Sequence, residues 1–164
     1  MARKINGFPG GARIEALIIS DSKILTIHRK NHGQEYWVLP GGRWEENETR
    51  EEGVVREVFE EVSLKVEVIR PVFFLHVEND GQKFVYLCKH LGGEPKLGNF
   101  NEKNTMALDG EQFYEPSWVT ISDLPKTKLY TLEFRDWFLE NYRNGQLPDE
   151  VFEMKIVRNQ FREE

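Results

Sequence analysis

The sequence lacks the features of disulfide-rich, membrane-spanning and nucleic-acid-binding proteins. A single cysteine, Cys88, occurs among 164 residues, so no disulfide can form within the chain, and one thiol in an apolar segment suits a reducing compartment. No apolar run approaches the ~18 residues that a membrane helix needs, and residues 1–11 lack the apolar core of a signal peptide. The 22 basic residues are outnumbered by 28 acidic ones, giving a net charge of −6. We therefore expect a cytoplasmic protein that binds neither long nucleic acid nor membrane, with a small molecule as its partner.

The length predicts one domain. A chain of 164 residues can bury roughly 70% of its unfolded surface around a single core. We place the domain at residues 1–146 and treat residues 147–164 as a C-terminal extension whose role the sequence does not define.

Residues 41–64 carry two overlapping patterns. At 100° per residue on a helix, one arc of roughly 140° holds the apolar residues Val54, Val55, Val58, Phe59 and Val62. The opposite arc holds Glu57, Glu60 and Glu61, which repel one another by a few tenths of a kcal/mol per pair. Such a run is usually a solvated helix face. Here, however, Pro40, Gly41 and Gly42 predict a tight turn just before the acids, and backbone carbonyls beside carboxylates suit Mg²⁺.

The spacing of these residues resembles the Nudix box, usually written G-x5-E-x7-R-E-U-x-E-E-x-G-U, where U is a bulky apolar residue. The matching fixed residues are Gly42, Glu48, Arg56, Glu57, Glu60 and Glu61. From the chain's own composition, these six would recur by chance on the order of 10⁻⁴ times per chain. Ser63 replaces the glycine that ends the helix in left-handed conformation, which implies strain of about 1 kcal/mol or a shifted helix end. Gly53, inside the helix, either leaves room beside the metals or has no role.

The resemblance implies a fold and a metal site. The element pattern supports an α+β fold, and the family's version is an α/β/α sandwich with a mixed β-sheet, matched here over about residues 13–142. In the family the box holds divalent metal on a diphosphate while water attacks phosphorus. The resemblance implies Mg²⁺, with Mn²⁺ as an alternative, on Glu57, Glu60, Glu61 and the carbonyl of Gly41.

Other site residues follow from the same resemblance. The general base is Glu57 or a glutamate of a later loop, where Glu111 is the first candidate and Glu115 the second; either loop acid can equally be a solvated residue. Arg56 is expected to hold the carboxylates through charged hydrogen bonds, and Glu48 to brace the loop at the helix start. Surface ion pairing is the alternative for both.

Three arginines, Arg13, Arg29 and Arg43, are candidates for the substrate phosphates, because a guanidinium group matches phosphate oxygens. Each alone is more often a surface residue. Tyr36, Trp37 and Phe73 can stack on a base, although aromatic residues on strands more often belong to the core.

The remaining pattern places the elements around the box. We expect a hairpin of residues 14–20 and 23–28, a loop at 29–35 and a short strand at 36–39. A second pair, 66–78 and 83–90, follows the helix, with a short strand near residue 118, one helical turn near residue 123 and a helix at 131–142. Phe152, Met154 and Ile156 alternate with polar residues like an edge strand, which can pair with a second subunit in a homodimer or fray.

The sequence thus predicts a Mg²⁺-dependent Nudix hydrolase. Its substrate would be a nucleoside diphosphate linked to another moiety, such as ADP-ribose, a nucleotide sugar or a (d)NTP. The alternative is a catalytically silent Nudix fold that senses a ligand or binds a partner. Such a module would usually have lost box glutamates, and all of them are present here.

Overall fold

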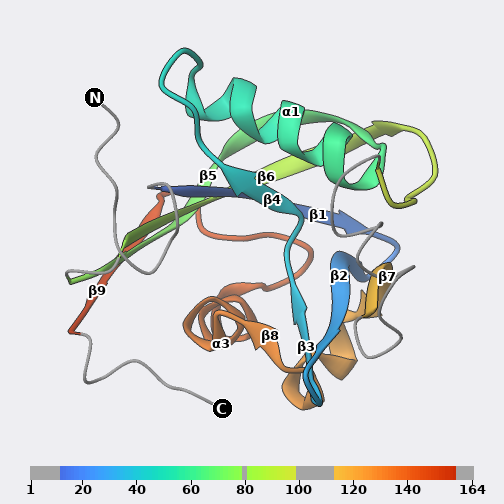
Figure 1. Cartoon of the computed structure of the whole chain (residues 1–164). Coiled ribbons are helices and arrows are strands. Elements are labelled where there is room, and N and C mark those ends of the chain that lie inside the picture. The colour runs from blue at the N-terminus through green and yellow to red at the C-terminus, as the bar shows by residue number, and fades with distance from the viewer. Residues whose placement is uncertain (1–11, 79–80, 99–112, 158–164) are drawn as a thin grey trace.

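The computed structural model describes residues 12–78, 81–98 and 113–157 (Figure 1). Its helical elements are α1 (Arg50–Val62), the 3₁₀ helix η1 (Ile121–Lys126) and α3 (Leu132–Asn141). Its strands are β1 (Arg13–Ser20), β2 (Lys23–Asn31), β3 (Gln34–Val38), β4 (Gly41–Arg43), β5 (Lys65–Val77), β6 (Gly81–Gly92), β7 (Phe113–Thr120), β8 (Leu129–Tyr130) and β9 (Phe152–Ile156). None of the helices in these ranges is long and apolar enough to cross a membrane.

The strands form one mixed sheet in the order β8-β3-β2-β1-β6-β5-β9, with β4 paired to β1 and β7 paired to β2. The pairs β1·β6, β3·β8 and β5·β9 are parallel, and the others are antiparallel. β1 and β2 pair where their connecting turn begins, at Ile19↔Ile24 and Ser20↔Lys23. Beyond that point the sheet divides into two wings: β1, β4, β5, β6 and β9 in one, and β2, β3, β7 and β8 in the other.

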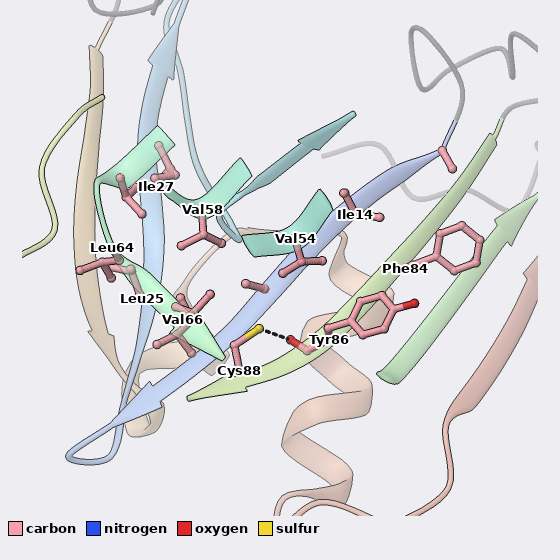
Figure 2. Close-up of a cluster of buried hydrophobic side chains, with 14 of the residues drawn as sticks. Ile14, Leu25, Ile27, Val54, Val58, Leu64, Val66, Phe84, Tyr86 and Cys88 are labelled. Carbon is pink, nitrogen blue, oxygen red and sulfur yellow. Dashed lines mark hydrogen bonds between the residues drawn. The ribbon is translucent and has the colours of Figure 1, made fainter. Parts of the chain in front are cut away.

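Helices cover both faces of the sheet, which confirms the α/β/α sandwich (Figure 1). Figure 2 shows Val54 and Val58 of α1 facing Ile14 of β1. On the other face, Phe134 and Phe138 of α3 form a second core with residues such as Leu17 and Phe73. Each core buries apolar side chains that would otherwise cost about 25 cal/mol per Å² of surface in water.

The predicted hairpins and helices are confirmed, but the predicted loop at residues 29–35 and the predicted turn at residues 40–42 are wrong. Most of residues 29–35 belong to strands, because β2 continues to Asn31 and β3 starts at Gln34. Only His32 and Gly33, with φ of 48° and 81°, form a two-residue turn between them. Likewise, Gly41 and Gly42 are not a tight turn but part of β4, in register with Glu15 and Ile14 of β1.

Close contact, not unusual backbone angles, explains these two glycines. A side chain on Gly41 would collide with the Ile14 carbonyl and with Glu15, and one on Gly42 would collide with the Glu57 carboxyl group. Both glycines therefore allow β4 to lie directly against β1 and α1.

The predicted apolar arc of α1 is only partly buried. Val54, Val58 and Val62 are fully buried, whereas Val55 is 39% and Phe59 53% exposed. The face of α1 that packs on the sheet runs from the buried Gly53 to Val62 and includes one side of the acidic arc. This orientation carries the carboxylates toward β1 and β4.

Near the C-terminus, β9 pairs in parallel with β5 at the sheet edge, as the alternation of residues 152–156 predicted. The preceding segment is fixed by Arg70, whose guanidinium group donates hydrogen bonds to the carbonyls of Leu147 and Asp149. The domain boundary at residue 146 and pairing with a second subunit stay predictions.

Candidate active site

The start and end of α1 are fixed by local hydrogen bonds. Thr49 Oγ1 accepts a hydrogen bond from the Glu52 N–H at 3.1 Å, and the Glu52 carboxylate accepts one from the Thr49 N–H at 2.9 Å. At the other end, Ser63 adopts the left-handed conformation (φ 61°) and its N–H donates to the Phe59 carbonyl at 3.0 Å. Serine thus takes the left-handed conformation expected of the missing glycine.

A cavity of about 380 Å³ lies between the two wings of the sheet. One side is formed by α1, β4, β1 and β6, and the other by β2, β3, β7 and β8. The cavity brings together predicted site residues from elements far apart in the sequence: Arg13, Arg29, Gly41, Glu57, Glu60 and Glu61.

Arg56 binds several groups at the edge of this cavity. Its Nε and Nη2 donate to both oxygens of Glu48 at 2.9 and 2.7 Å, and its Nη1 donates to Glu57 at 2.9 Å and Glu60 at 3.2 Å. Nη2 also donates to the Arg43 carbonyl at 3.1 Å. The hydrogen bond from Arg56 is the main reason that the pKa of Glu48 lies below its usual range. This geometry suits the bracing role proposed for Arg56 and Glu48.

Glu61 lies deeper and is held by different donors. Its Oε1 accepts from the Gly41 N–H at 3.1 Å, and its Oε2 accepts from the Tyr114 hydroxyl at 3.1 Å. Burial raises the pKa of Glu61 to about 7, against the lowering effect of Arg13 and these two hydrogen bonds. Burial also raises the pKa of Glu57. Both carboxylates are therefore costly as isolated anions, and a nearby cation would stabilise their charged forms.

The donor set fits a hard divalent cation in chemistry, although the side chains are not closed around one. Glu57, Glu60 and Glu61 line one cavity with Gly41, and carboxylate and carbonyl oxygens are the ligands that Mg²⁺ prefers. Within the described ranges, no three acidic, His or Cys side chains are gathered closely enough to enclose an ion. Arg56, the Gly41 N–H and the Tyr114 hydroxyl donate to these carboxylate oxygens, and an oxygen that accepts one hydrogen bond keeps a second lone pair for a cation.

The three predicted phosphate-binding arginines differ in position. Arg13 and Arg29 line the cavity, whereas the Arg43 side chain is exposed and is not part of its lining. The Arg29 guanidinium carbon lies 4.6 Å from the centre of the Tyr114 ring and 5.5 Å from that of Tyr36, and its buried Nε has no hydrogen-bond partner among the described residues. Arg29 thus lies within cation–π distance of two aromatic rings and lines the cavity.

The structure distinguishes between the three candidate general bases. Glu111 lies outside the described residues, as does its neighbour Gln112. Glu115 is exposed on β7, and because the adjacent Tyr114 lines the cavity, strand alternation turns Glu115 away from it. Glu57 is the remaining described candidate.

The predicted aromatic residues occupy three different settings. Phe73 is fully buried in the core, and Trp37 is stacked on His28 at 4.3 Å between ring centres. Tyr36 lies beside Tyr130, which lines the cavity, with 5.4 Å between their ring centres.

Sequence reasoning missed six cavity residues: Glu15, Val38, Lys83, Tyr114, Tyr130 and Thr131. Glu15 and Lys83 did carry a signal, since each is a charged residue inside an otherwise apolar strand pattern. Tyr114 carried none, because a tyrosine on a half-buried strand is ordinary.

Comparison with known proteins gives a consistent result. A family model described as NUDIX domain matches residues 12–138. An 8-oxo-dGDP phosphatase from Danio rerio is 30% identical over 137 residues, which cover 82% of this chain and 37% of the relative. This chain spans between 27% and 54% of the length of the curated relatives it matches.

Solved structures share the fold. A NUDIX hydrolase from Nitrosomonas europaea superposes with a TM-score of 0.69 at 19% identity, covering 90% of this chain and 78% of the other. An ADP-ribose pyrophosphatase from Streptococcus suis superposes with a TM-score of 0.61 at 26% identity, covering 88% and 98%.

Proposed function

Because the chain belongs to the Nudix family, we propose that it is a Mg²⁺-dependent hydrolase that cleaves the pyrophosphate bond of a nucleoside diphosphate linked to another moiety. The observation that carries the proposal is the single cavity in which the box carboxylates Glu57, Glu60 and Glu61 face Arg13 and Arg29. A site with carboxylates for cations and guanidinium groups for phosphate oxygens matches what a pyrophosphate requires.

The metal site would be formed by Glu57, Glu60, Glu61 and the carbonyl of Gly41. Bound there, Mg²⁺ or Mn²⁺ supplies charge neutralisation for the phosphates and lowers the pKa of a bound water. Arg56 orients Glu57 and Glu60 through its hydrogen bonds, and the Gly41 N–H and Tyr114 hydroxyl orient Glu61. Because these contacts already restrict the carboxylates, less conformational freedom is lost when they bind a cation.

The protein's own residues would bind the substrate and accept a proton from the attacking water. Arg13 and Arg29 contact phosphate oxygens from two sides of the cavity, and the exposed Arg43 contributes only if a bound substrate extends to the outer edge. We assign the general base to Glu57, which lines the cavity together with the other box carboxylates, with Glu111 as the alternative.

The proposed substrates share one chemical feature, a pyrophosphate bond. The relatives named above act, according to their names, on 8-oxo-dGDP and ADP-ribose, and both compounds contain a pyrophosphate bond. ADP-ribose, nucleotide sugars and (d)NTPs all present this bond, so we propose this class without a preference for one member.

The decisive experiment is incubation of the protein and Mg²⁺ with ADP-ribose, a nucleotide sugar, 8-oxo-dGDP and nucleoside triphosphates, followed by product identification. We expect a nucleoside monophosphate to be released from one class. Binding of Mg²⁺ without turnover of any compound would contradict the proposal and favour the silent sensing module.

The Glu60→Gln variant tests the site itself. Removing this carboxylate charge should reduce kcat at least about a hundredfold, because one metal ligand is lost while the fold is kept. The exposed Glu67 on β5 gives a matched control, Glu67→Gln, expected to retain full activity. Equal rates for Glu60→Gln and the parent protein would remove Glu60 from the site.

A further inference from the structure

Three charged side chains lie together on one wall of the cavity, which we call its floor: Arg13 and Glu15 of β1, and Lys83 of β6. Lys83 Nζ lies 3.1 Å from Glu15 Oε1, and Arg13 Nε donates to Glu15 Oε2 at 3.2 Å. Arg13 and Lys83 are Cα partners in the parallel β1·β6 ladder, which fixes their separation. All three residues line the cavity.

Two of these residues are buried to an extent that is rare for charges. The exposed fractions of the side chains are 2% for Glu15 and 4% for Lys83, against 36% for Arg13. A buried ion pair is a weak source of stability, because removing both charges from water costs about as much as their attraction returns. Apolar residues would fit these strands at least as well, since Leu17 and Val85, on the same face of β1 and β6, are part of the second core. Stability alone therefore gives little reason for this cluster.

The charges of the cluster do not cancel. One carboxylate faces two cations, so the floor carries a net charge of about +1 when all three groups are ionised. Burial lowers the pKa of Lys83 while the Glu15 carboxylate opposes this effect. Glu61 of α1 balances part of the Arg13 charge, and a phosphate beside Lys83 and Arg13 would balance the rest.

The geometry leaves donors for such an anion. Glu15 accepts from Arg13 through Nε, a contact that uses neither Nη nitrogen, and a lysine ammonium has three N–H donors of which this pairing needs one. Arg13 also interacts electrostatically with the box carboxylate Glu61. Burial by itself lowers the pKa of Arg13, but the attraction of Glu15 and Glu61 outweighs burial and raises this pKa. The cluster is thus continuous with the proposed metal site.

We propose that Lys83 and Arg13, held in place by Glu15, form an anion subsite that binds a phosphate group of the substrate on the cavity floor. Lys83 acts here as a direct phosphate ligand and Glu15 as a positioning residue. The identity of the anion rests on the proposed function, but the binding itself requires no turnover.

The test measures binding of inorganic pyrophosphate by calorimetry in EDTA and again in excess Mg²⁺. The Lys83→Met variant removes the ammonium group and keeps most of the side-chain volume. We expect at least a tenfold loss of pyrophosphate affinity in both conditions. Lys89→Met, which changes an exposed lysine of the same strand, is the matched control and should bind like the parent.

A double variant guards against misfolding. Glu15→Gln/Lys83→Met removes both charges of the buried pair, so no uncompensated carboxylate remains, and it should fold and still bind pyrophosphate weakly. With a hydrolysed substrate, Lys83→Met should raise KM about tenfold with kcat within twofold of the parent, a split that a purely structural pair would not produce.

The outcomes separate the two proposals. Pyrophosphate affinity equal in Lys83→Met and the parent, or no binding by the parent, would overturn the subsite. If the parent binds pyrophosphate through Lys83 but hydrolyses no nucleotide, the subsite stands and the proposed function fails.

Discussion

Tyr114 links the two halves of the candidate site. Its hydroxyl donates to Glu61, a proposed metal ligand, and its ring lies against Arg29, a proposed phosphate ligand. The side chain is 7% exposed, so neither contact competes strongly with water. The two functions of this residue can be separated by substitution.

We predict that Tyr114→Phe weakens metal activation without weakening substrate binding. The variant keeps the ring under Arg29 and loses the hydrogen bond to Glu61, so the Mg²⁺ concentration for half-maximal activity should rise about three- to tenfold. Tyr114→Leu should also raise KM, because the ring is gone. Steady-state kinetics and Mg²⁺-dependent melting measure both effects, with Tyr142→Phe as control. An unchanged metal requirement in Tyr114→Phe would show that Glu61 needs no positioning by the hydroxyl.

Glu61 also predicts a pH dependence of the metal-free protein. Burial raises its pKa to about 7 in the folded state, whereas an unfolded glutamate titrates near 4.3. Between these values the folded state binds more protons than the unfolded state, so the free energy of unfolding should fall as pH rises from about 4.5 to 7 and level off above.

Urea unfolding in EDTA across this pH range measures the slope. Glu61→Gln should flatten it, because the neutral amide has no proton to lose. Glu67→Gln, at an exposed site, should leave it unchanged. A parent whose stability rises steadily over the same interval would show that Glu61 is not protonated in the folded state.

At the scale of elements, the sequence predicted what depends on local pattern. The hairpin turn at Asp21 and Ser22, the box helix and the edge strand at residues 152–156 follow from alternation, spacing and turn residues. The capping box of Thr49 and Glu52 is a local pattern as well, but the sequence prediction did not use it to place the helix start.

Contacts between distant segments could not be predicted in this way. Whether Pro40, Gly41 and Gly42 form a turn or a strand depends on β1 approaching them, and the exposure of Phe59 depends on how α1 is rotated on the sheet. The pairing of Glu15 with Lys83 joins residues 68 positions apart through the β1·β6 ladder. Local pattern contains no information on such pairings, which tertiary packing decides.

Gly53 shows the difference between the two scales. Helix propensity alone predicts that Gly53→Ala stabilises α1 by about 1 kcal/mol. In the folded protein, a side chain there would collide with the fully buried Ile14 and lie 2.7 Å from Glu48 Oε1. Arg56 holds the Glu48 carboxylate with one hydrogen bond to each oxygen. Neither neighbour can move freely.

We therefore predict that Gly53→Ala destabilises the protein by about 1–2 kcal/mol, as overpacking does. Urea unfolding measures the change. Glu52→Ala would disturb the cap, so Glu140→Ala, at an exposed position of α3, is the better control and should change stability by less than about 0.5 kcal/mol. A more stable Gly53→Ala would mean that α1 lies further from β1 than described.

For the whole molecule, the important feature is the cavity between two wings of one sheet. The proposed metal ligands and the anion subsite belong to α1 and the β1 wing, while Arg29, Tyr114, Tyr130 and Thr131 belong to the β2 wing. A cation alone would contact the first wing, and a diphosphate bound to it would contact both. Ligands should therefore stabilise the fold in two steps.

We predict that Mg²⁺ raises the melting temperature and that a non-hydrolysable diphosphate analogue raises it further. A ligand at 100 times its Kd stabilises the folded state by about 2.7 kcal/mol, which corresponds to roughly 5–10 °C for a chain of this length. The second increment should be larger in Mg²⁺ than in EDTA and should shrink in Arg29→Met, which removes the guanidinium group of the β2 wing. Sodium chloride at matched ionic strength controls for general screening of the acidic surface. A melting temperature equal in Mg²⁺ and in sodium chloride would mean that the glutamates of α1 are an ordinary solvated face, because specific ligation cannot occur without stabilising the state that binds.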